Sequence, residues 1–456
     1  MLTQNQTPFL FAAKVCSRRP PQPEMTMIVR ATFALAPNVP LEPAEEQGAL
    51  TAEVFHEDDE ARLGECLYAG DFADFKLNAE VLLKGTCHVP GGRPVVECPV
   101  RATVGAWSKT LLVIGPRAWS SRFPGATASE PSSFTSMPLG YQGSFGGPDF
   151  ARNPVGRGHG SLSLPIVESP SEPVRSRGDQ PAPAGFGPLN PAWPQRRGKL
   201  GKAYGKAYRE KRAPYYAEDF DWSYFSAAPA DQQLSGYLRG DEEVSFHNLH
   251  PTAATIEARL PGLRVRAFVK DVEQRFREVY LAIDTLFADL DAGTLTLTWR
   301  GVDEVKEQDL SDITTVLIAS EPMAERALPE AHYRAQIEAF ERDPVGLAAA
   351  IPPSLVEAGD LMERERRGEA PPAVTNPEDP LGSLLERKLG KSGAAEHAGV
   401  LRAIQGAGSK SGQGSKTGES VAMAAGTLAP IVPVAVPLKP GSMPPIRLRE
   451  TMRKVM

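Results

Sequence analysis

Glycine and proline together approach a fifth of this chain, and they constrain its fold more than any other feature of the sequence. The 456 residues include 41 glycines and 43 prolines. Both residue types are unfavourable inside α-helices, and both are common in turns. The composition therefore excludes a helical bundle and predicts a body rich in β-strands, with many turns and long irregular segments.

Alternating side chains predict strands on both sides of the middle of the chain. Residues 26–35 and 294–300 carry apolar side chains at every second position, and Leu295, Leu297 and Trp299 give the clearest alternation. This period is typical of strands with one buried face. β-branched residues and short turns favour antiparallel pairing, so we expect an antiparallel β-sandwich or a distorted barrel. Further strands are expected at residues 79–89, 95–104, 109–114, 255–260, 264–269 and 278–284.

Residues 116–250 differ from the segments on either side. They are rich in proline and glycine, and they also contain many aromatic residues. A disordered linker is typically poor in aromatic residues. We therefore expect long, ordered loops that aromatic side chains pin over a sheet. Residues 1–320 would form one β-rich domain with a loop-rich insertion at about 116–250.

The pattern changes after residue 320. Apolar residues at helical spacing among charged ones predict a helix over residues 329–342. We expect this helix to belong to a helical extension at residues 321–366, with a few helices at about 329–366. Residues 367–456 are of low complexity and are expected to form a disordered, flexible tail. Within this tail, residues 432–438 are extended in pattern, and we expect them to add as a strand to the sheet edge of a partner.

The sequence predicts a cytoplasmic protein with no membrane span. Residues 1–8 are polar and lack a basic region followed by an apolar run, and no run of about 20 apolar residues occurs in the chain. The hydrophobic fraction of 41% and the net charge of −6 fit a soluble protein with a real core. Four cysteines in so long a chain predict buried free thiols rather than a disulfide framework: Cys16, Cys66, Cys87 and Cys98.

The best set of soft metal ligands in the sequence is Cys66, Cys87, His88 and Cys98. It contains no Cys-x-x-Cys pair, and neighbouring residues such as Cys87 and His88 point to opposite faces of a strand. No nucleophile elbow and no phosphate-binding loop are present either. We therefore expect no metal and no cofactor.

Carboxylates occur in two groups, at Asp219 with Asp221 and at residues 241–243. Paired carboxylates can perform acid/base chemistry or hold Mg²⁺, so a metal-assisted hydrolase is one alternative function. Solvated turn acids are the more common case. The sequence therefore favours a protein that is not an enzyme.

Residues 196–212 are the strongest electrostatic feature. Eight basic residues stand here with a single acid, Glu210, and Tyr204 and Tyr208 are interleaved among them. This pattern suits a platform for single-stranded nucleic acid, an acidic protein surface or a solvated loop. The acidic balance of the whole chain argues against nucleic acid, so a nucleic-acid-binding protein is the second alternative function.

Several dense motifs follow one another along the chain: residues 74–85, 104–111, 134–139, 144–149, 153–158, 183–188, 227–233 and 236–242. With these motifs in this order, the chain resembles, over about residues 8–320, an uncharacterised-domain family of type VI secretion accessory proteins. The resemblance implies an effector adaptor or chaperone without catalytic residues. Such a protein binds a secreted toxin and helps load it onto the spike, which consists of VgrG and often PAAR.

An adaptor of this kind would bind its partner through exposed loop side chains. Tyrosine, tryptophan and arginine dominate the energetics of protein interfaces. We expect the loop aromatics to be exposed and to supply contacts together with nearby arginines. The expected partner-binding residues are Trp193, Arg196, Arg197, Tyr204, Tyr208, Trp222, Tyr224, Phe225 and Arg239.

Overall fold

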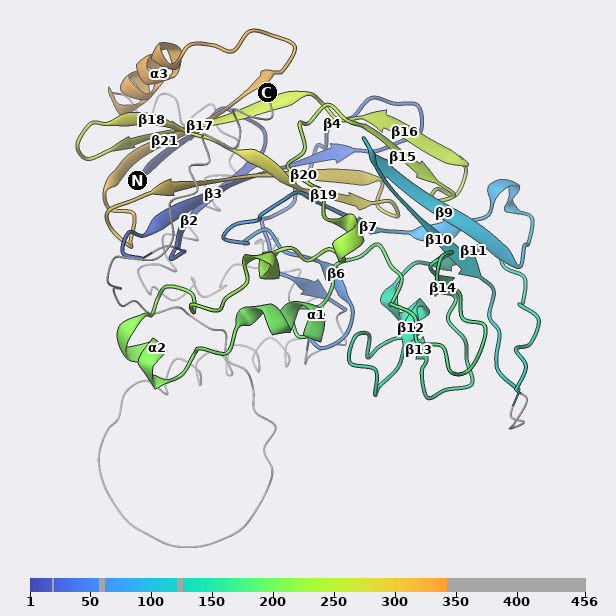
Figure 1. Ribbon diagram of the computed structural model, residues 1–456. Helices are drawn as coiled ribbons and strands as arrows, with labels where there is room; N and C mark the ends of the chain where they lie inside the picture. The colour runs from blue at the N-terminus through green and yellow to red at the C-terminus, as the bar shows by residue number, and fades with distance from the viewer. Residues whose placement is uncertain (19, 57–61, 121–125, 343–456) are drawn as a thin grey trace, which may run out of the picture. The chain divides into compact units, whose positions relative to one another are not determined.

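The two segments with the clearest alternation form neighbouring strands at the centre of the computed structural model (Figure 1). β3 (Glu24–Ala34) and β20 (Thr294–Glu304) are 11 residues long and pair antiparallel. Apolar side chains from one face of each strand, among them Phe33 and Trp299, lie in the main hydrophobic core. Period-two alternation therefore identified the centre of the fold correctly.

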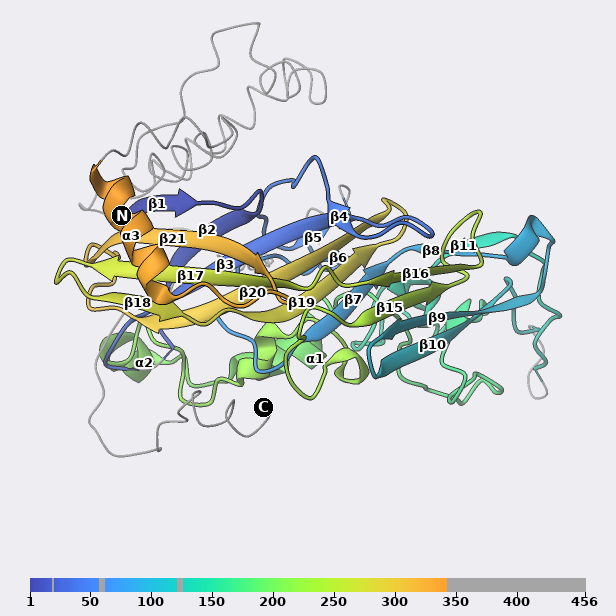
Figure 2. The same ribbon diagram turned by 90° about the horizontal axis from the view of Figure 1, so that it is seen from above.

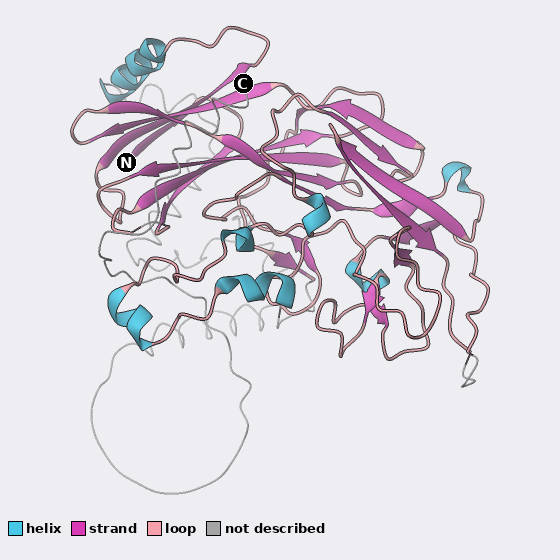
Figure 3. Ribbon diagram, viewed as in Figure 1, coloured by secondary structure: helices cyan, strands magenta, loops and turns pink. Residues whose placement is uncertain are grey.

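The structure describes residues 1–18, 20–56, 62–120 and 126–342, and these belong to one compact unit. The expected helices beyond residue 342, the flexible tail and the docking strand at residues 432–438 lie outside the described residues. Strands are far more common than helices in the described part, as Figure 3 shows. The prediction of a mainly β protein is confirmed.

The first sheet has the strand order β2–β3–β20–β19–β7, and β4 pairs with β3. Its further strands are β2 (Leu10–Cys16), β19 (Ala282–Asp289), β7 (Glu80–Lys84) and β4 (Glu42–Pro43). β7 runs parallel to β19, which the expectation of antiparallel pairing missed. Parallel pairing is available here because long connections separate the two strands.

The second sheet has the order β1–β21–β17–β18. Its strands are β1 (Leu2–Asn5), β21 (Ile313–Pro322), β17 (Leu263–Asp271) and β18 (Phe276–Val279), and β1 is again parallel to its neighbour. The predicted helix is confirmed as α3 (Glu330–Arg342). It packs against this sheet in a small apolar cluster, and Figure 2 shows it lying over β21 and β17.

The third sheet has the order β14–β10–β9–β15–β16. Its strands are β14 (Val167–Glu168), β10 (Trp107–Ile114), β9 (Glu97–Val104), β15 (Glu243–His247) and β16 (Thr255–Arg259). The pairing within this sheet is antiparallel throughout, as predicted.

One hydrophobic core joins the three sheets, because it contains apolar side chains from strands of all of them. Sheets that share an apolar core in this way form a sandwich. In the described part of the chain the strand orders remain open, so the barrel alternative is wrong.

Long loops cover the other face of the first sheet (Figure 1). On this face Thr26 and Arg30 of β3 are buried although they are polar. Their hydrogen-bond partners lie in residues 47–74, outside the segment predicted to cover the sheet. Long ordered loops are therefore confirmed as part of the fold, and they also occur before residue 116. The loops contain the helices α1 (Pro194–Arg197) and α2 (Lys206–Lys211). The remaining short elements are β5 (Val54–Phe55), β6 (Cys66–Tyr68), β8 (Thr86–His88), η1 (Pro90–Gly92), β11 (Ser136–Pro138), η2 (Tyr141–Gly143), β12 (Phe145–Gly146), β13 (Arg157–Gly158), η3 (Gly198–Leu200), η4 (Trp222–Phe225) and η5 (Ala230–Gln232).

Candidate functional site

Buried hydrogen bonds fasten the loops to the first sheet. The Nζ of Lys76 lies 2.5 Å from Oε1 of Glu80 and 2.6 Å from Oγ1 of Thr285 on β19. The second oxygen of Glu80 accepts a hydrogen bond from the backbone N–H of Ala228 at 2.9 Å. A buried charge is stable only when it is paired and hydrogen-bonded, so these contacts hold two separate loops in a fixed position.

Gln232 supplies a second fastening point. Its Nε2 donates to the carbonyls of Val81 and Phe186 at 2.7 and 2.8 Å, and its Oε1 accepts from Lys109 at 2.7 Å. The pKa of Lys109 is lowered, chiefly by burial, while the nearby Asp231 opposes that shift. Gln232 therefore joins its loop to β7 through Val81 and to β10 through Lys109.

Two of the predicted contact residues are buried, so their expected exposure is wrong. Trp193 is only 2% exposed, packs edge-on against Tyr141 at 5.5 Å and donates from Nε1 to the carbonyl of Leu63 at 3.1 Å. Arg196 is only 3% exposed and donates to the carbonyls of Tyr224 and Leu189 at 3.2 and 3.1 Å. Backbone carbonyls without a helix or strand partner need such donors.

Five aromatic rings gather in the segment that contains η4. Tyr216 and Phe220 are 4.4 Å apart, Phe220 and Trp222 are 5.0 Å apart, and Tyr224 and Phe225 are 5.6 Å apart. Trp222, Tyr224 and Phe225 are half-buried. The hydroxyl of Tyr216 donates to Asp74, and burial raises the pKa of this phenol. The sequence therefore identified a real aromatic cluster, which is partly covered.

The basic segment lies directly against this cluster. The N–H of Asp221 donates to the carbonyl of Lys199 at 2.9 Å, and Nζ of Lys199 donates to the carbonyl of Ser223 at 3.1 Å. Asp219 accepts from the N–H of Lys202 at 2.6 Å. These bonds place residues 199–202 beside η4.

Four cations of this segment are exposed: Arg197, Lys202, Lys206 and Lys211. Lys206 pairs with Glu210 at 3.6 Å, and the charge of Lys202 lies near Asp219 and helps to lower the pKa of that carboxyl group. Tyr204 and Tyr208 are half-buried and pack edge-on at 4.8 Å. We call residues 193–225 the loop face. It combines exposed positive charge with partly covered aromatic rings.

A small pocket of about 100 Å³ lies at the loop face. Three predicted residues line it, Arg196, Tyr224 and Phe225, and the Arg196 guanidinium lies 5.1 Å from the centre of the Tyr224 ring. Lys76 and Glu53 also line the pocket, and sequence reasoning missed both. Lys76 stands in the motif at residues 74–85, which was the available signal. The lining combines two cations, aromatic rings and small alanine and glycine residues, with one carboxylate 3.9 Å from Arg196.

Arg239 does not join the aromatic cluster. It lies in the turn before β15, is exposed, and pairs with Asp241 at 3.0 Å. Its nearest partners are therefore acids of its own turn.

The carboxylates considered for catalysis hold turns. Asp221 accepts from the N–H of Ser223 at 2.9 Å at the start of η4. The hydrogen bond from the N–H of Lys202 is the main reason why the pKa of Asp219 is lowered. A general acid needs the opposite shift.

All four cysteines are buried free thiols, as predicted. Burial raises the pKa of the Cys66 thiol to about 12 and lowers the pKa of His88. In the parts of the chain that the structure describes, no group of three or more His, Cys, Asp or Glu side chains could hold a metal.

None of the helices at residues 1–342, where they are described, is long and apolar enough to cross a membrane.

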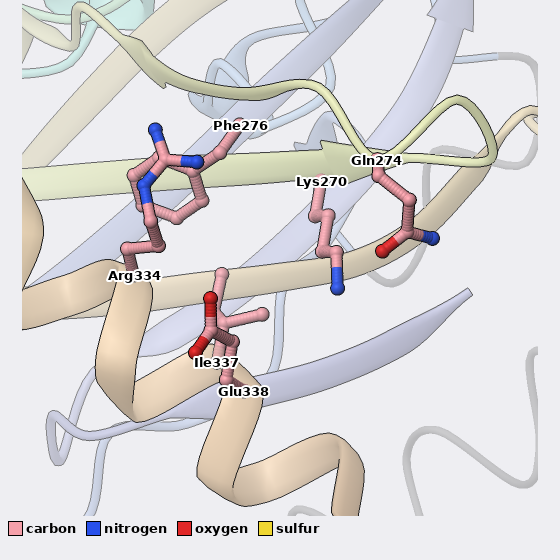
Figure 4. A pocket seen from close by; sticks show the side chains of 6 residues that line it. All are labelled: Lys270, Gln274, Phe276, Arg334, Ile337 and Glu338. Carbon is pink, nitrogen blue, oxygen red and sulfur yellow. The ribbon is translucent and has the colours of Figure 1, made fainter.

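A second pocket of about 140 Å³ lies between α3 and the β17–β18 hairpin (Figure 4). Lys270 and Arg334 line it from opposite sides, as the close view shows. Both already have acidic partners, since Lys270 lies 2.5 Å from Glu341 and Arg334 lies 3.0 Å from Glu330. The first pair joins the hairpin to α3, the second lies within α3, and together they occupy both cations of the pocket lining.

Comparison with known proteins identifies one family. A family model described as "Uncharacterized protein conserved in bacteria (DUF2169)" matches residues 21–300, which is more than half of the chain. The matched region contains β3 of the first sheet, β9 and β15 of the third sheet, and the whole loop face. No curated protein and no solved structure matches the chain significantly. The chain therefore belongs to this family of conserved bacterial proteins.

Proposed function

We propose that this protein is a non-catalytic adaptor that binds a secreted effector and helps load it onto the VgrG or PAAR spike of a type VI secretion system. The observation that supports binding is the loop face. Exposed cations and partly covered aromatic rings lie side by side there, on a segment that is tied to other loops by the hydrogen bonds from Trp193 to the carbonyl of Leu63 and from Tyr216 to Asp74.

Such a surface suits another polypeptide for two physical reasons. Loops that are already ordered lose little conformational entropy on binding, so more of the contact energy appears as affinity. Aromatic and arginine side chains bury large areas, and exposed cations speed the encounter with an acidic surface. Arg197, Lys202 and Lys206 would meet acidic side chains of the effector, while Trp222 and Tyr224 would meet apolar ones.

The type VI assignment depends on the motif resemblance over about residues 8–320. Two of these motifs build the support of the loop face. Residues 74–85 contain Lys76 and Glu80, and residues 227–233 contain Gln232. The motifs would therefore maintain the surface that receives the effector. The adaptor would act in the cytoplasm, before secretion.

Co-purification tests this proposal. The full chain is tagged and expressed with the effector, VgrG and PAAR proteins that are encoded beside it in the host genome. We expect the effector to co-purify and to elute at raised salt, because exposed charges are screened. Recovery of neither effector nor spike protein with a folded adaptor would contradict the proposal.

Nucleic-acid binding by the same face is the second candidate, because Tyr204 and Tyr208 lie among the cations. Glu218 and Asp219 are exposed in the same segment and oppose a polyphosphate. A single-stranded oligonucleotide titrated at several salt concentrations separates the two candidates. A steep loss of affinity with salt supports nucleic acid, and absence of binding at low salt removes this candidate.

A further inference from the structure

β16 ends the third sheet with an open edge (Figure 1). In its antiparallel ladder with β15, the N–H of Asn248 donates to the carbonyl of Ala254, and the N–H of Leu260 donates to the carbonyl of Glu242. Residues along an antiparallel strand alternate between pointing their backbone groups at the partner and away from it. Even-numbered residues of this strand therefore bond to β15, and Thr255, Glu257 and Arg259 point their N–H and C=O groups outward.

No other described segment satisfies these outward groups. Among the described residues, the backbone N–H and C=O of Thr255, Glu257 and Arg259 have no hydrogen-bond partner. The edge of the first sheet at β7 is different, because the N–H of Leu83 donates to the carbonyl of Phe186 at 3.1 Å and loops cover that strand. An open strand edge is a template for another strand.

The side chains of β16 separate into two faces. Ile256 and Leu260 are buried in the main core, while Glu257 and Arg259 are exposed on the outer face. The two exposed charges have opposite sign and stand two residues apart. Charged side chains protect an edge from pairing when they meet like charges on the incoming strand. This edge carries a self-complementary pair instead.

We propose that β16 is a self-association edge, at which a second copy of this chain adds its own β16 in antiparallel orientation. In the register centred on Ala258, Glu257 lies opposite Arg259 of the second copy, and the reverse pair forms on the other side of the two-fold axis. The neighbouring register, centred on Glu257, would place two glutamates opposite each other, which is unfavourable. Charge therefore selects the register.

The hydrogen bonds agree with this register. Glu257 and Arg259 both belong to the outward-pointing set, so each pair exchanges two backbone hydrogen bonds across the interface. Thr255 lies opposite Pro261, which has no N–H and ends the ladder. On its own sheet Arg259 is the ladder partner of Glu243 and donates from Nε to the carbonyl of Asp241 at 2.9 Å. Glu257 of the second copy would add an acid on the other side of Arg259.

The molar mass of the purified full chain tests the proposal, measured by sedimentation over a concentration series. We expect the mass to rise from 49.1 kDa to twice that value with concentration. Glu257→Pro removes an outward N–H and breaks no bond to β15, so it should leave a monomer with an unchanged circular dichroism spectrum. Glu257→Thr keeps the N–H and is the matched control, which should still dimerise. A monomeric wild type, or dimerisation of Glu257→Pro like wild type, would overturn the proposal.

Charge exchange provides a second test that does not depend on proline. Glu257→Arg places like charges at the axis and should weaken dimerisation by about tenfold, and Arg259→Glu should do the same. The double exchange restores opposite pairs across the interface and should recover most of the affinity when Glu243→Arg is added, which keeps an opposite charge beside residue 259 within the sheet. Failure of this combined variant to recover, with folded single variants, would contradict the register. Amides of Thr255, Glu257 and Arg259 should also gain hydrogen-exchange protection as concentration rises.

Discussion

The Nε of Arg300 on β20 donates to Oδ2 of Asp284 on β19 at 2.6 Å, and both side chains are 2% exposed. The same guanidinium donates from Nη1 to the carbonyls of Asp71 and Ala73 at 2.9 and 2.7 Å. One buried side chain therefore joins two strands of the first sheet to the loop above them. Ala73 of that loop lines the pocket at the loop face together with Tyr224 and Phe225.

Arg300→Met should destabilise the protein by about 3–5 kcal/mol, because it leaves the Asp284 carboxylate buried without its partner. The double variant Arg300→Met with Asp284→Leu removes both charges and should recover much of that loss. Urea unfolding measures both values. Equal stability of the single variant and wild type would contradict the structural role.

Gln232→Leu should lower the free energy of unfolding by about 2 kcal/mol. The buried carbonyl of Val81 loses its side-chain donor, Lys109 loses an acceptor, and the carbonyl of Phe186 keeps only the N–H of Leu83. Gln233→Leu is the matched control. Gln233 is half-buried and donates only to the carbonyl of Ala228 at 2.9 Å, so we expect a loss of about 1 kcal/mol or less. Chemical unfolding of both variants gives the comparison, and a reversed order would refute this ranking.

Trp193 and Trp222 should respond differently to truncation. Trp193→Ala removes a buried ring and its hydrogen bond, and should cost about 3–5 kcal/mol. Trp222→Ala alters a half-buried ring and should cost clearly less, while it weakens effector binding. Thermal unfolding and binding measured on the same preparations separate the two roles. Similar stability losses would show that Trp222 also serves the core.

Acid should loosen α3. Burial alone would raise the pKa of Glu341, but hydrogen bonds from Lys270 and Thr315 lower it below the ordinary 4.5. A carboxyl group with a lowered folded-state pKa stabilises the fold above its unfolded-state pKa, and this contribution is lost as pH falls through the folded-state value. Between about pH 5 and pH 3, the amides of α3 should therefore lose hydrogen-exchange protection after correction for intrinsic rates.

Glu341→Gln should weaken this pH dependence, because the glutamine does not titrate. Glu338→Gln, on the same helix, should keep it. An unchanged dependence in Glu341→Gln would show that another group controls the docking of α3.

Local patterns predicted part of the fold well. β20 and α3 were found because period-two and helical spacing are properties of short segments. The parallel pairs β1–β21 and β7–β19 were missed because they join segments far apart in the chain, which local alternation does not record. The alternation in residues 294–300 places Arg300 on the face of the strand opposite the apolar side chains. It does not show that loops cover this face and bury the arginine.

The candidate site was predicted in the same incomplete way. Composition identified the aromatic cluster and the exposed Arg197, because residue type alone favours them at interfaces. It could not separate them from Trp193 and Arg196, whose burial depends on the carbonyls of distant loops. Glu53 and Lys76 were missed for the related reason that the pocket forms only when the loops fold over the sheet.

The central claim is that the loop face binds another polypeptide, and effector affinity measured by titration calorimetry tests it most directly. Lys202→Glu with Lys206→Glu reverses two exposed cations of the loop face. Arg93→Glu with Arg101→Glu makes the same change in net charge at exposed residues elsewhere. We predict that the first pair weakens binding by about tenfold or more and that the second leaves it nearly unchanged. Equal effects of the two pairs, or wild-type affinity after reversal of the loop-face cations, would contradict the account.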